Sequence, residues 1–140
     1  MLIRKVVLMI ALGLTCSSAM AEWKKAGTSG NMVVYADLGN ILRKGSAAKI
    51  WFIFDYKVPQ TLEGGNDAPY LSIKGQMEAN CGEEQIRLLA MSVHKANMGA
   101  GSIIFSDYSI KEDFEAVAPD SNYRMLYKRA CTKQSLWEKN

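Results

Sequence analysis

Between Leu71 and Cys81, small or apolar residues alternate strictly with polar residues. A period of two is typical of a β-strand that has one dry face and one wet face. The dry positions are Leu71, Ile73, Gly75, Met77, Ala79 and Cys81. The pattern therefore predicts a half-buried strand that carries Cys81 on its core side.

A second apolar pattern, near the C-terminal end, has the spacing of one helix face. Its members are Tyr123, Leu126, Tyr127, Ala130 and Cys131. Pro119 is followed by Asp120 and Ser121, and either of these two residues is a suitable N-cap. The sequence thus predicts a C-terminal helix that points Cys131 into the same core as Cys81.

The first residues of the chain have the pattern of a secretory signal. Two basic residues precede an apolar run at 6–14, and Ala19 and Ala21 occupy the small-residue positions of a cleavage site. The run is shorter than the ~20 apolar residues that a membrane span needs. We expect residues 1–21 to be a signal peptide and residues 22–140 to form a single domain, without a transmembrane segment.

Lipid attachment at Cys16 is the alternative form of processing. A lipoprotein signal needs a small residue before the cysteine and usually a leucine two places earlier, but Thr15 and Gly13 stand there. Cleavage at the alanine positions fits better, and it removes Cys16. The remaining cysteines, Cys81 and Cys131, are an even pair, which predicts a disulfide in an exported chain.

The remaining segments complete the predicted fold. Further strands are expected at 22–26, 32–37, 47–56, 85–94 and 103–108, with loops at 38–46 and 57–69. The 47–56 strand is apolar on both faces, which indicates a central strand that the helix covers. We predict an α+β fold, in which an antiparallel meander sheet of about six strands packs against one C-terminal helix and is joined to it by the disulfide.

The sequence gives little support for catalysis, a metal or a cofactor. His94 is the single histidine, whereas a metal site needs several convergent ligands. Bonded cysteines serve neither as nucleophiles nor as ligands. The glycines at 99–101 are not followed by a predicted helix, so they indicate a hairpin turn instead of a phosphate-binding loop. We expect no enzyme activity.

Charge also excludes one class of partner. The chain has 17 basic and 14 acidic residues, and cleavage of the signal removes two of the basic ones. The mature chain is close to neutral, so no overall field attracts it to nucleic acid. Any electrostatic recognition must be local.

A local candidate lies on the predicted helix, opposite its apolar side. Arg124, Lys128 and Arg129 share that side with Met125, and no acidic residue lies among them. One interpretation is a solvated surface whose later cations suit the helix C-terminus. The other is a docking site for an acidic protein or sulfated glycan, which salt would weaken.

Short features along the mature chain follow a familiar order. They include Trp23, Gly27, the VYAD sequence at 34–37, WFIFDY at 51–56, Cys81, RLL at 87–89, Pro119 and Cys131. Together they resemble the surface-adhesin protein E-like family of small exported bacterial proteins. The resemblance implies a sheet-plus-helix fold joined by a disulfide, no enzymatic activity, and adhesin-like binding of host matrix proteins.

Two classes of function are therefore expected. The first is an adhesin-like module at the cell surface that contacts host matrix proteins or acidic ligands. The second is a soluble periplasmic protein that binds another envelope component. Because a good lipid-attachment signal is missing, we expect the exported chain in the periplasm, with the cell surface or secretion as the alternative.

Overall fold

The computed structural model describes residues 21–64 and 68–132 of the chain. Most of the expected signal peptide lies outside these residues, as do part of the 57–69 loop and the tail after Thr132. Cleavage before Glu22 therefore stays a prediction.

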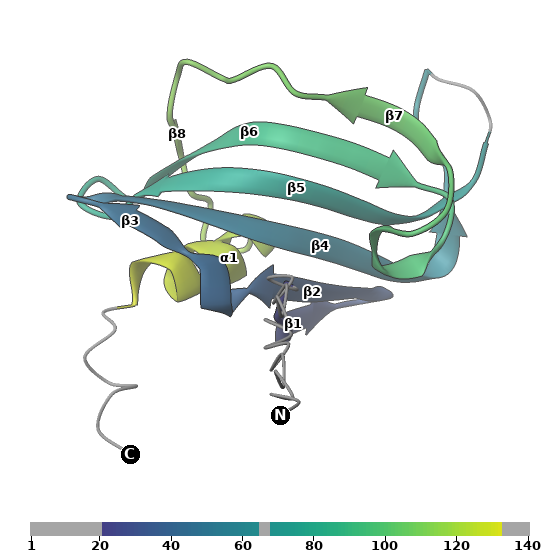
Figure 1. Ribbon diagram of the computed structural model, residues 1–140, viewed down its shortest axis with the longest axis horizontal. Helices are drawn as coiled ribbons and strands as arrows, with labels where there is room; N and C mark the ends of the chain where they lie inside the picture. The colour runs from purple at the N-terminus through teal and green to yellow at the C-terminus, as the bar shows by residue number, and fades with distance from the viewer. Residues whose placement is uncertain (1–20, 65–67, 133–140) are drawn as a thin grey trace, which may run out of the picture.

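One antiparallel sheet and one helix make up the described chain (Figure 1). The strands are β1 (Trp23–Ser29), β2 (Met32–Asp37), β3 (Leu42–Lys44), β4 (Ala47–Gln60), β5 (Tyr70–Asn80), β6 (Gln85–His94), β7 (Ile103–Asp107) and β8 (Glu115–Ala116). Their main order is β1-β2-β4-β5-β6-β7, with β3 paired to β4 and β8 paired to β6. Helix α1 (Asn122–Cys131) lies against one face, which confirms the predicted α+β meander.

In the central pair of strands, β4 and β5, one small residue of the alternating pattern allows close packing of a large one. Phe52 lies opposite Gly75 in the register. A Cβ atom on Gly75 would lie 2.6 Å from Phe52 Cζ and 2.8 Å from the carbonyl oxygen of Ala90. The glycine is therefore needed because the phenyl ring crosses the β5 backbone on the core side.

The core lies between α1 and the sheet face that carries the alternating apolar residues. Phe52 and Leu126 are fully buried, and the ring of Tyr123 packs edge-on against Phe52 and Phe54, with centroids 5.8 and 5.4 Å apart. Burial of such large apolar groups is the main source of stability in a domain of this size. The predicted apolar face of the helix is thus the one that meets the sheet.

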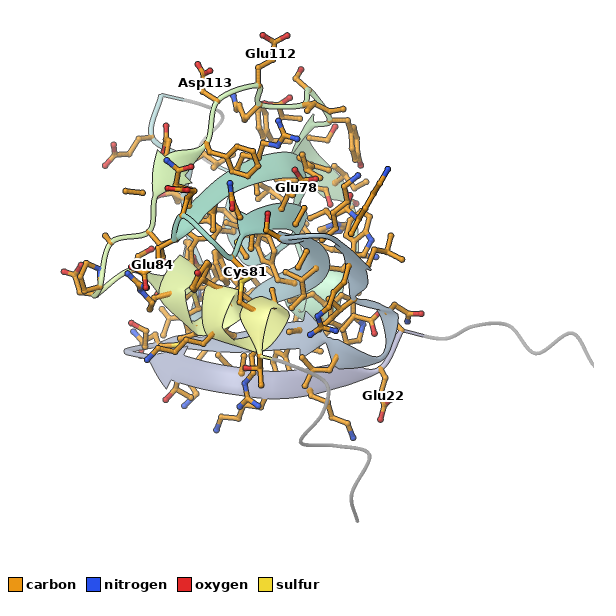
Figure 2. The ribbon with its side chains drawn as sticks, turned by 90° about the vertical axis from the view of Figure 1, so that its left-hand side faces the viewer. Glu22, Glu78, Cys81, Glu84, Glu112 and Asp113 are labelled. Carbon is orange, nitrogen blue, oxygen red and sulfur yellow. A yellow bond between two sulfur atoms is a disulfide. The ribbon has the colours of Figure 1, made fainter. Side chains whose placement is uncertain are left out.

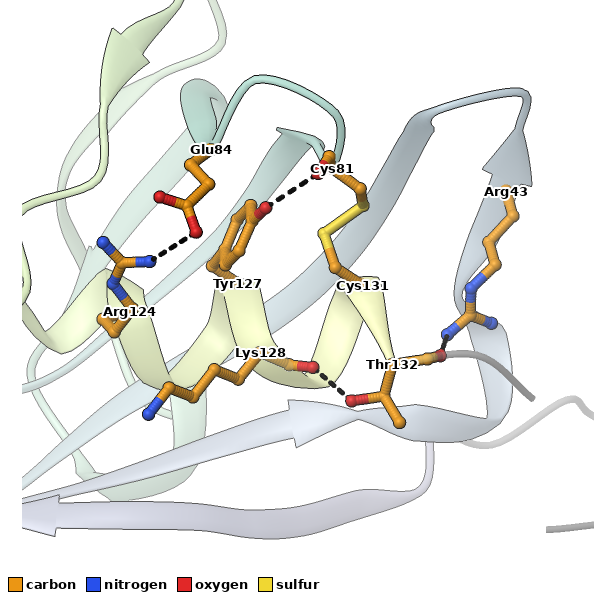
Figure 3. The surroundings of a disulfide bond; sticks show 8 residues. All are labelled: Arg43, Cys81, Glu84, Arg124, Tyr127, Lys128, Cys131 and Thr132. Atoms are coloured by element: carbon orange, nitrogen blue, oxygen red, sulfur yellow. Dashed lines mark hydrogen bonds and ion pairs between the residues drawn. A yellow bond between two sulfur atoms is a disulfide. The ribbon is translucent and has the colours of Figure 1, made fainter. Parts of the chain in front are cut away.

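The disulfide between Cys81 and Cys131 is present, as predicted, with their Cα atoms 5.5 Å apart (Figure 3). It joins the end of β5 to the last turn of α1. The Tyr127 hydroxyl donates to the Cys81 carbonyl oxygen at 3.1 Å. The helix is therefore attached to the sheet covalently and by a hydrogen bond at the same corner.

Strand lengths differ in places from the sequence prediction. β4 continues to Gln60, so the first residues of the expected 57–69 loop belong to a strand. The short strand β3 lies in the 38–46 segment, which was expected to be a loop, and β8 lies where no strand was expected. Both are held by pairing with a neighbouring strand, which local sequence does not reveal.

A β-bulge in β6 changes which side chains share a face. Met77 pairs with Leu88 while Gln76 pairs with Ala90, so Leu89 is the extra residue. A bulge of this kind reverses the alternation beyond it. Ala90 therefore lies on the opposite side from Leu88, whereas a regular strand at 85–94 would place both on the same side.

Candidate ligand-binding surface

The orientation of α1 is fixed at its start and along its buried side. The Ser121 hydroxyl accepts a hydrogen bond from the Tyr123 backbone N–H at 3.2 Å, which confirms Ser121 as the N-cap. Leu126, Tyr127 and Ala130 are buried against the sheet. The three predicted binding residues lie at other positions of the helix, and none of them is fully buried.

Arg124 is not a free cation. Its Nη2 donates to the Val117 carbonyl oxygen at 2.7 Å, and its Nη1 lies 3.8 Å from Glu84 Oε1 (Figure 3). Only 18% of the side chain is exposed. The acidic partner comes from the turn between β5 and β6, forty residues earlier, so spacing along the helix did not reveal it. The contacts of Arg124 with Val117 and Glu84 therefore hold the helix against the rest of the fold.

Met125, which the sequence places beside the cations, also packs inward. Its Sδ atom lies above Gly27, where a Cβ would be only 2.5 Å away, and the side chain packs against the buried core. The side of the helix opposite the predicted apolar face is thus partly covered by β1. Of the three predicted cations, the accessible ones are therefore Lys128 and Arg129, in the last turn of the helix.

Lys128 and Arg129 remain accessible on that part of the helix. Lys128 is exposed, and Arg129 is half-buried. Arg129 lines a hollow of about 340 Å³ together with Arg43 of β3 and Lys24 of β1. The structure therefore brings one of the three predicted residues next to two cations that the sequence analysis did not select.

Two interactions position the walls of this hollow, which we call the basic hollow. The Arg43 Nη2 donates to the Thr132 carbonyl oxygen at 3.0 Å. The Lys24 Nζ lies 3.1 Å from Glu22 Oε1, between two well-exposed side chains. The remaining lining residues are Leu38, Gly39 and Ile41. Three cations against one carboxylate give the hollow a net positive charge.

The chemistry of the basic hollow suits an anionic group. Arginine presents a planar fork of N–H donors that matches a carboxylate or sulfate. Because Arg43 uses one nitrogen for Thr132 and Arg129 lies beside it, further donors remain for a ligand. The cations come from positions 24, 43 and 129, and only the folded sheet brings them together.

Several acidic residues lie away from the basic hollow. Glu112 and Asp113 project from the connection between β7 and β8, on the opposite side of the molecule from Glu22 (Figure 2). Nearby, the backbone N–H of Ser109 donates to Asp107 and lowers the pKa of that carboxyl. The molecule thus has acidic and basic regions at separate places, although its net charge is small.

A further hollow, of about 470 Å³, lies between β6 and the connection that carries these acids. Arg87 is held there by Glu78, at 2.7 Å, and donates to the Glu112 carbonyl oxygen at 3.1 Å. It also lies over the Phe114 ring, 4.5 Å from the centroid. The polar groups of this hollow are therefore used to hold the connection against the sheet.

Residues 21–64 and 68–132 contain no cluster of three or more histidine, cysteine, aspartate or glutamate side chains that could hold a metal. Within the same residues, no helix has the length and apolar character to cross a membrane. Both cysteines of the described chain are in the disulfide.

Comparison with known proteins identifies one family. Residues 23–132 match the family described as Surface-adhesin protein E. A structure of Haemophilus influenzae protein E superposes with a TM-score of 0.57 at 11% identity, over 80% of this chain and 85% of that one. Protein E from non-typeable Haemophilus influenzae gives 0.54 at 11%, over 82% and 76%. At this identity the structural likeness shows a shared fold. A search of curated protein sequences finds no match.

Proposed function

Because the chain belongs to the Surface-adhesin protein E family, we propose that it is an exported, non-enzymatic, adhesin-like protein that binds an acidic ligand through the basic hollow. The ligand would be an acidic segment of a host matrix protein or an acidic glycan. The observation that carries this proposal is the placement of Lys24, Arg43 and Arg129 around one hollow. Lys128, which directly precedes Arg129 on the helix, is exposed beside them.

Several cations around one hollow favour an anion for a simple electrostatic reason. Each contributes attraction that is weakened by dissolved salt, since the screening length is only about 8 Å at physiological ionic strength. Such surfaces accelerate encounter with an oppositely charged partner. Binding by this surface should therefore fall as ionic strength rises.

A direct test compares the charge-removed variant with a matched control on immobilised heparin. In the variant, Lys128 and Arg129 are replaced with Ser; in the control, the exposed Lys57 and Lys95 are replaced with Ser. Both lose two positive charges, but only the first loses them at the proposed site. We expect the first to elute at clearly lower salt, and the control to elute close to wild type.

The same elution for both double variants would contradict the basic hollow as the binding site. The search for a ligand site would then move to the 57–69 connection. A third variant, Arg43→Ser, checks the hollow from the sheet side. It should reduce retention in the same direction as the helix variant, because Arg43 lines the same hollow from another element.

The alternative is a soluble periplasmic protein that binds another envelope component, which the missing lipid-attachment signal favours. The two functions differ in where the protein is found. Fractionation of cells, combined with protease treatment of intact cells, separates them. Degradation of the protein on intact cells supports the surface function, and protection together with release from the periplasm supports the alternative.

A further inference from the structure

Helix α1 covers one face of the sheet and leaves the other face uncovered by a helix (Figure 1). A separate group of aromatic and polar residues lies on that second face. Lys74 of β5 lies opposite Ser92 of β6, and Ser72 lies opposite His94 in the same pairing. The 3-10 turn Asn97–Gly99 folds over one end of this face. The Gly99 N–H donates to the Ser72 hydroxyl at 2.9 Å, which fixes the turn on the sheet.

Beside this turn lies a hollow of about 240 Å³, which we call the outer hollow. Its apolar lining includes Trp51, Ile103 and Tyr108, and the last two are 55% and 63% exposed. Its polar lining includes Ser92 and His94, each only 7% exposed. The outer hollow therefore combines the exposed Tyr108 and Ile103 and the partly buried Trp51 with buried hydrogen-bonding groups, an arrangement typical of small-molecule sites.

The polar groups of the outer hollow retain unused capacity. The Ser92 hydroxyl lies 2.7 Å from His94 Nε2. A hydroxyl has one proton and two acceptor lone pairs, so this single contact leaves Ser92 able to bond a ligand group. Burial lowers the pKa of His94, a backbone hydrogen bond with Gly101 partly opposes this effect, and the neighbouring charge of Lys74 adds a smaller lowering effect. At neutral pH the imidazole is therefore uncharged.

Lys74 fixes the aromatic part of this face. Its Nζ lies 5.6 Å from the centroid of the Trp51 ring and 5.8 Å from that of Trp23. Contacts of this kind attract the ammonium group to the ring faces. The lysine therefore orders Trp51 and leaves a positive group beside the outer hollow.

The lining excludes a cationic ligand. No carboxylate lines the outer hollow, and Lys74 is its only charged lining residue among the described residues. The aromatic walls instead suit an uncharged, partly apolar ring, while Ser92 and Lys74 offer hydrogen bonds to hydroxyl groups. The volume is below the usual ~300 Å³ minimum of ligand pockets, so it suits one ring.

We propose that the outer hollow binds one residue of a neutral sugar whose ring hydroxyls are equatorial. Such a ring presents C–H groups on both faces, which pack on the flat surfaces of Trp51 and Tyr108, and presents hydroxyls at its edge, which reach Ser92 and Lys74. This site lies on the face away from α1 and is independent of the basic hollow. It adds a second, uncharged mode of recognition to the molecule.

The test uses cellotetraose, an uncharged oligomer of equatorial sugar rings, in saturation-transfer NMR with the mature protein. Tyr108→Ala is the main variant, because a side chain that is 63% exposed contributes little to folding. We expect the dissociation constant to rise about tenfold, from loss of one aromatic wall. Tyr108→Phe retains the ring and should bind within about twofold of wild type.

The controls distinguish binding at the outer hollow from nonspecific apolar binding and from binding at the basic hollow. Ile110→Ala removes an exposed apolar side chain that does not line the outer hollow, and it should bind cellotetraose as wild type does. The variant in which Lys128 and Arg129 are both replaced with Ser should also bind cellotetraose as wild type does. No saturation transfer with wild type at millimolar sugar, or unchanged binding by Tyr108→Ala, would overturn the proposal.

Discussion

Arg124 on α1 and Glu84 in the β5–β6 turn face each other across the boundary between helix and sheet, with Nη1 and Oε1 3.8 Å apart. The same guanidinium donates to the Val117 carbonyl oxygen at 2.7 Å and lies over the Tyr127 ring, 5.5 Å from its centroid. These contacts hold the first turns of the helix to two earlier segments of the chain.

Replacement of Arg124 should therefore affect folding more than ligand binding. Arg124→Ser leaves the Val117 carbonyl without its donor, so we expect the free energy of unfolding to fall by about 1–3 kcal/mol. Lys128→Ser, at an exposed position of the same helix, should change it by no more than about 0.5 kcal/mol. Urea unfolding of the two variants measures the difference, and equal effects would show that Arg124 has no structural role.

Patterns within single segments predicted much of the fold. The alternation that ends at Cys81, the helix spacing that ends at Cys131 and the N-cap at Ser121 are all local, because backbone periodicity decides which side chains share a face. The structure contains the strand, the helix with its disulfide and the N-cap, but Ser72 and Glu78, on the face of β5 predicted to be wet, are buried.

Features that depend on tertiary proximity were not predictable in this way. Glu84 lies far from Arg124 in the sequence, and the cations of the basic hollow come from three separate elements. The bulge at Leu89 depends on how β6 pairs with β5. Arg43 lies in the 38–46 segment, which was expected to be a loop and instead contains β3.

The disulfide should account for a large part of the stability. The two cysteines are 50 residues apart in the chain, and closing a loop of that length stabilises a fold by roughly 4 kcal/mol in the loop-entropy model. We expect Cys131→Ser to lower the free energy of unfolding by a few kcal/mol, and non-reducing peptide mapping of exported protein to show one linked pair. Free thiols at both positions would contradict the attachment of helix to sheet.

Gly75 should not tolerate even a methyl group. A Cβ there would lie 2.6 Å from Phe52 Cζ and 2.8 Å from a backbone oxygen, which cannot move aside easily. We expect Gly75→Ala to cost about 1–3 kcal/mol of stability, as overpacked cores do. Gly82→Ala is the matched control, because its nearest atom would be 3.7 Å away. Thermal melts that agree for the two variants would rule out close packing at Gly75.

Processing of the chain can be measured by the intact mass of exported protein. Because Ala19 and Ala21 occupy the cleavage positions, we expect a mature chain that begins at Glu22. The Ala21→Arg variant should accumulate as uncleaved precursor, while Met20→Leu should be processed normally. A lipid-modified species that begins at Cys16 would refute both the cleavage site and the periplasmic location.

The stability of the fold should depend on pH through His94, the single histidine of the chain. Burial lowers its pKa below 6.5 in the folded protein, and the charged group facing it, Lys74, acts in the same direction. The unfolded chain therefore binds a proton more readily than the folded one. This contribution to stability is fully present above the unfolded pKa of about 6.5 and is lost as pH falls through the folded value.

We expect the free energy of unfolding to decrease between about pH 7.5 and about pH 5.5, with a slope of at most about 1.4 kcal/mol per pH unit. His94→Asn cannot be protonated in this range. Even if that variant is less stable at neutral pH, its unfolding free energy should change less over the interval, because the carboxylates that remain titrate mainly at lower pH. Urea unfolding at constant ionic strength gives both slopes. Equal slopes for wild type and variant would show that the folded protein accommodates a charged imidazole at this position.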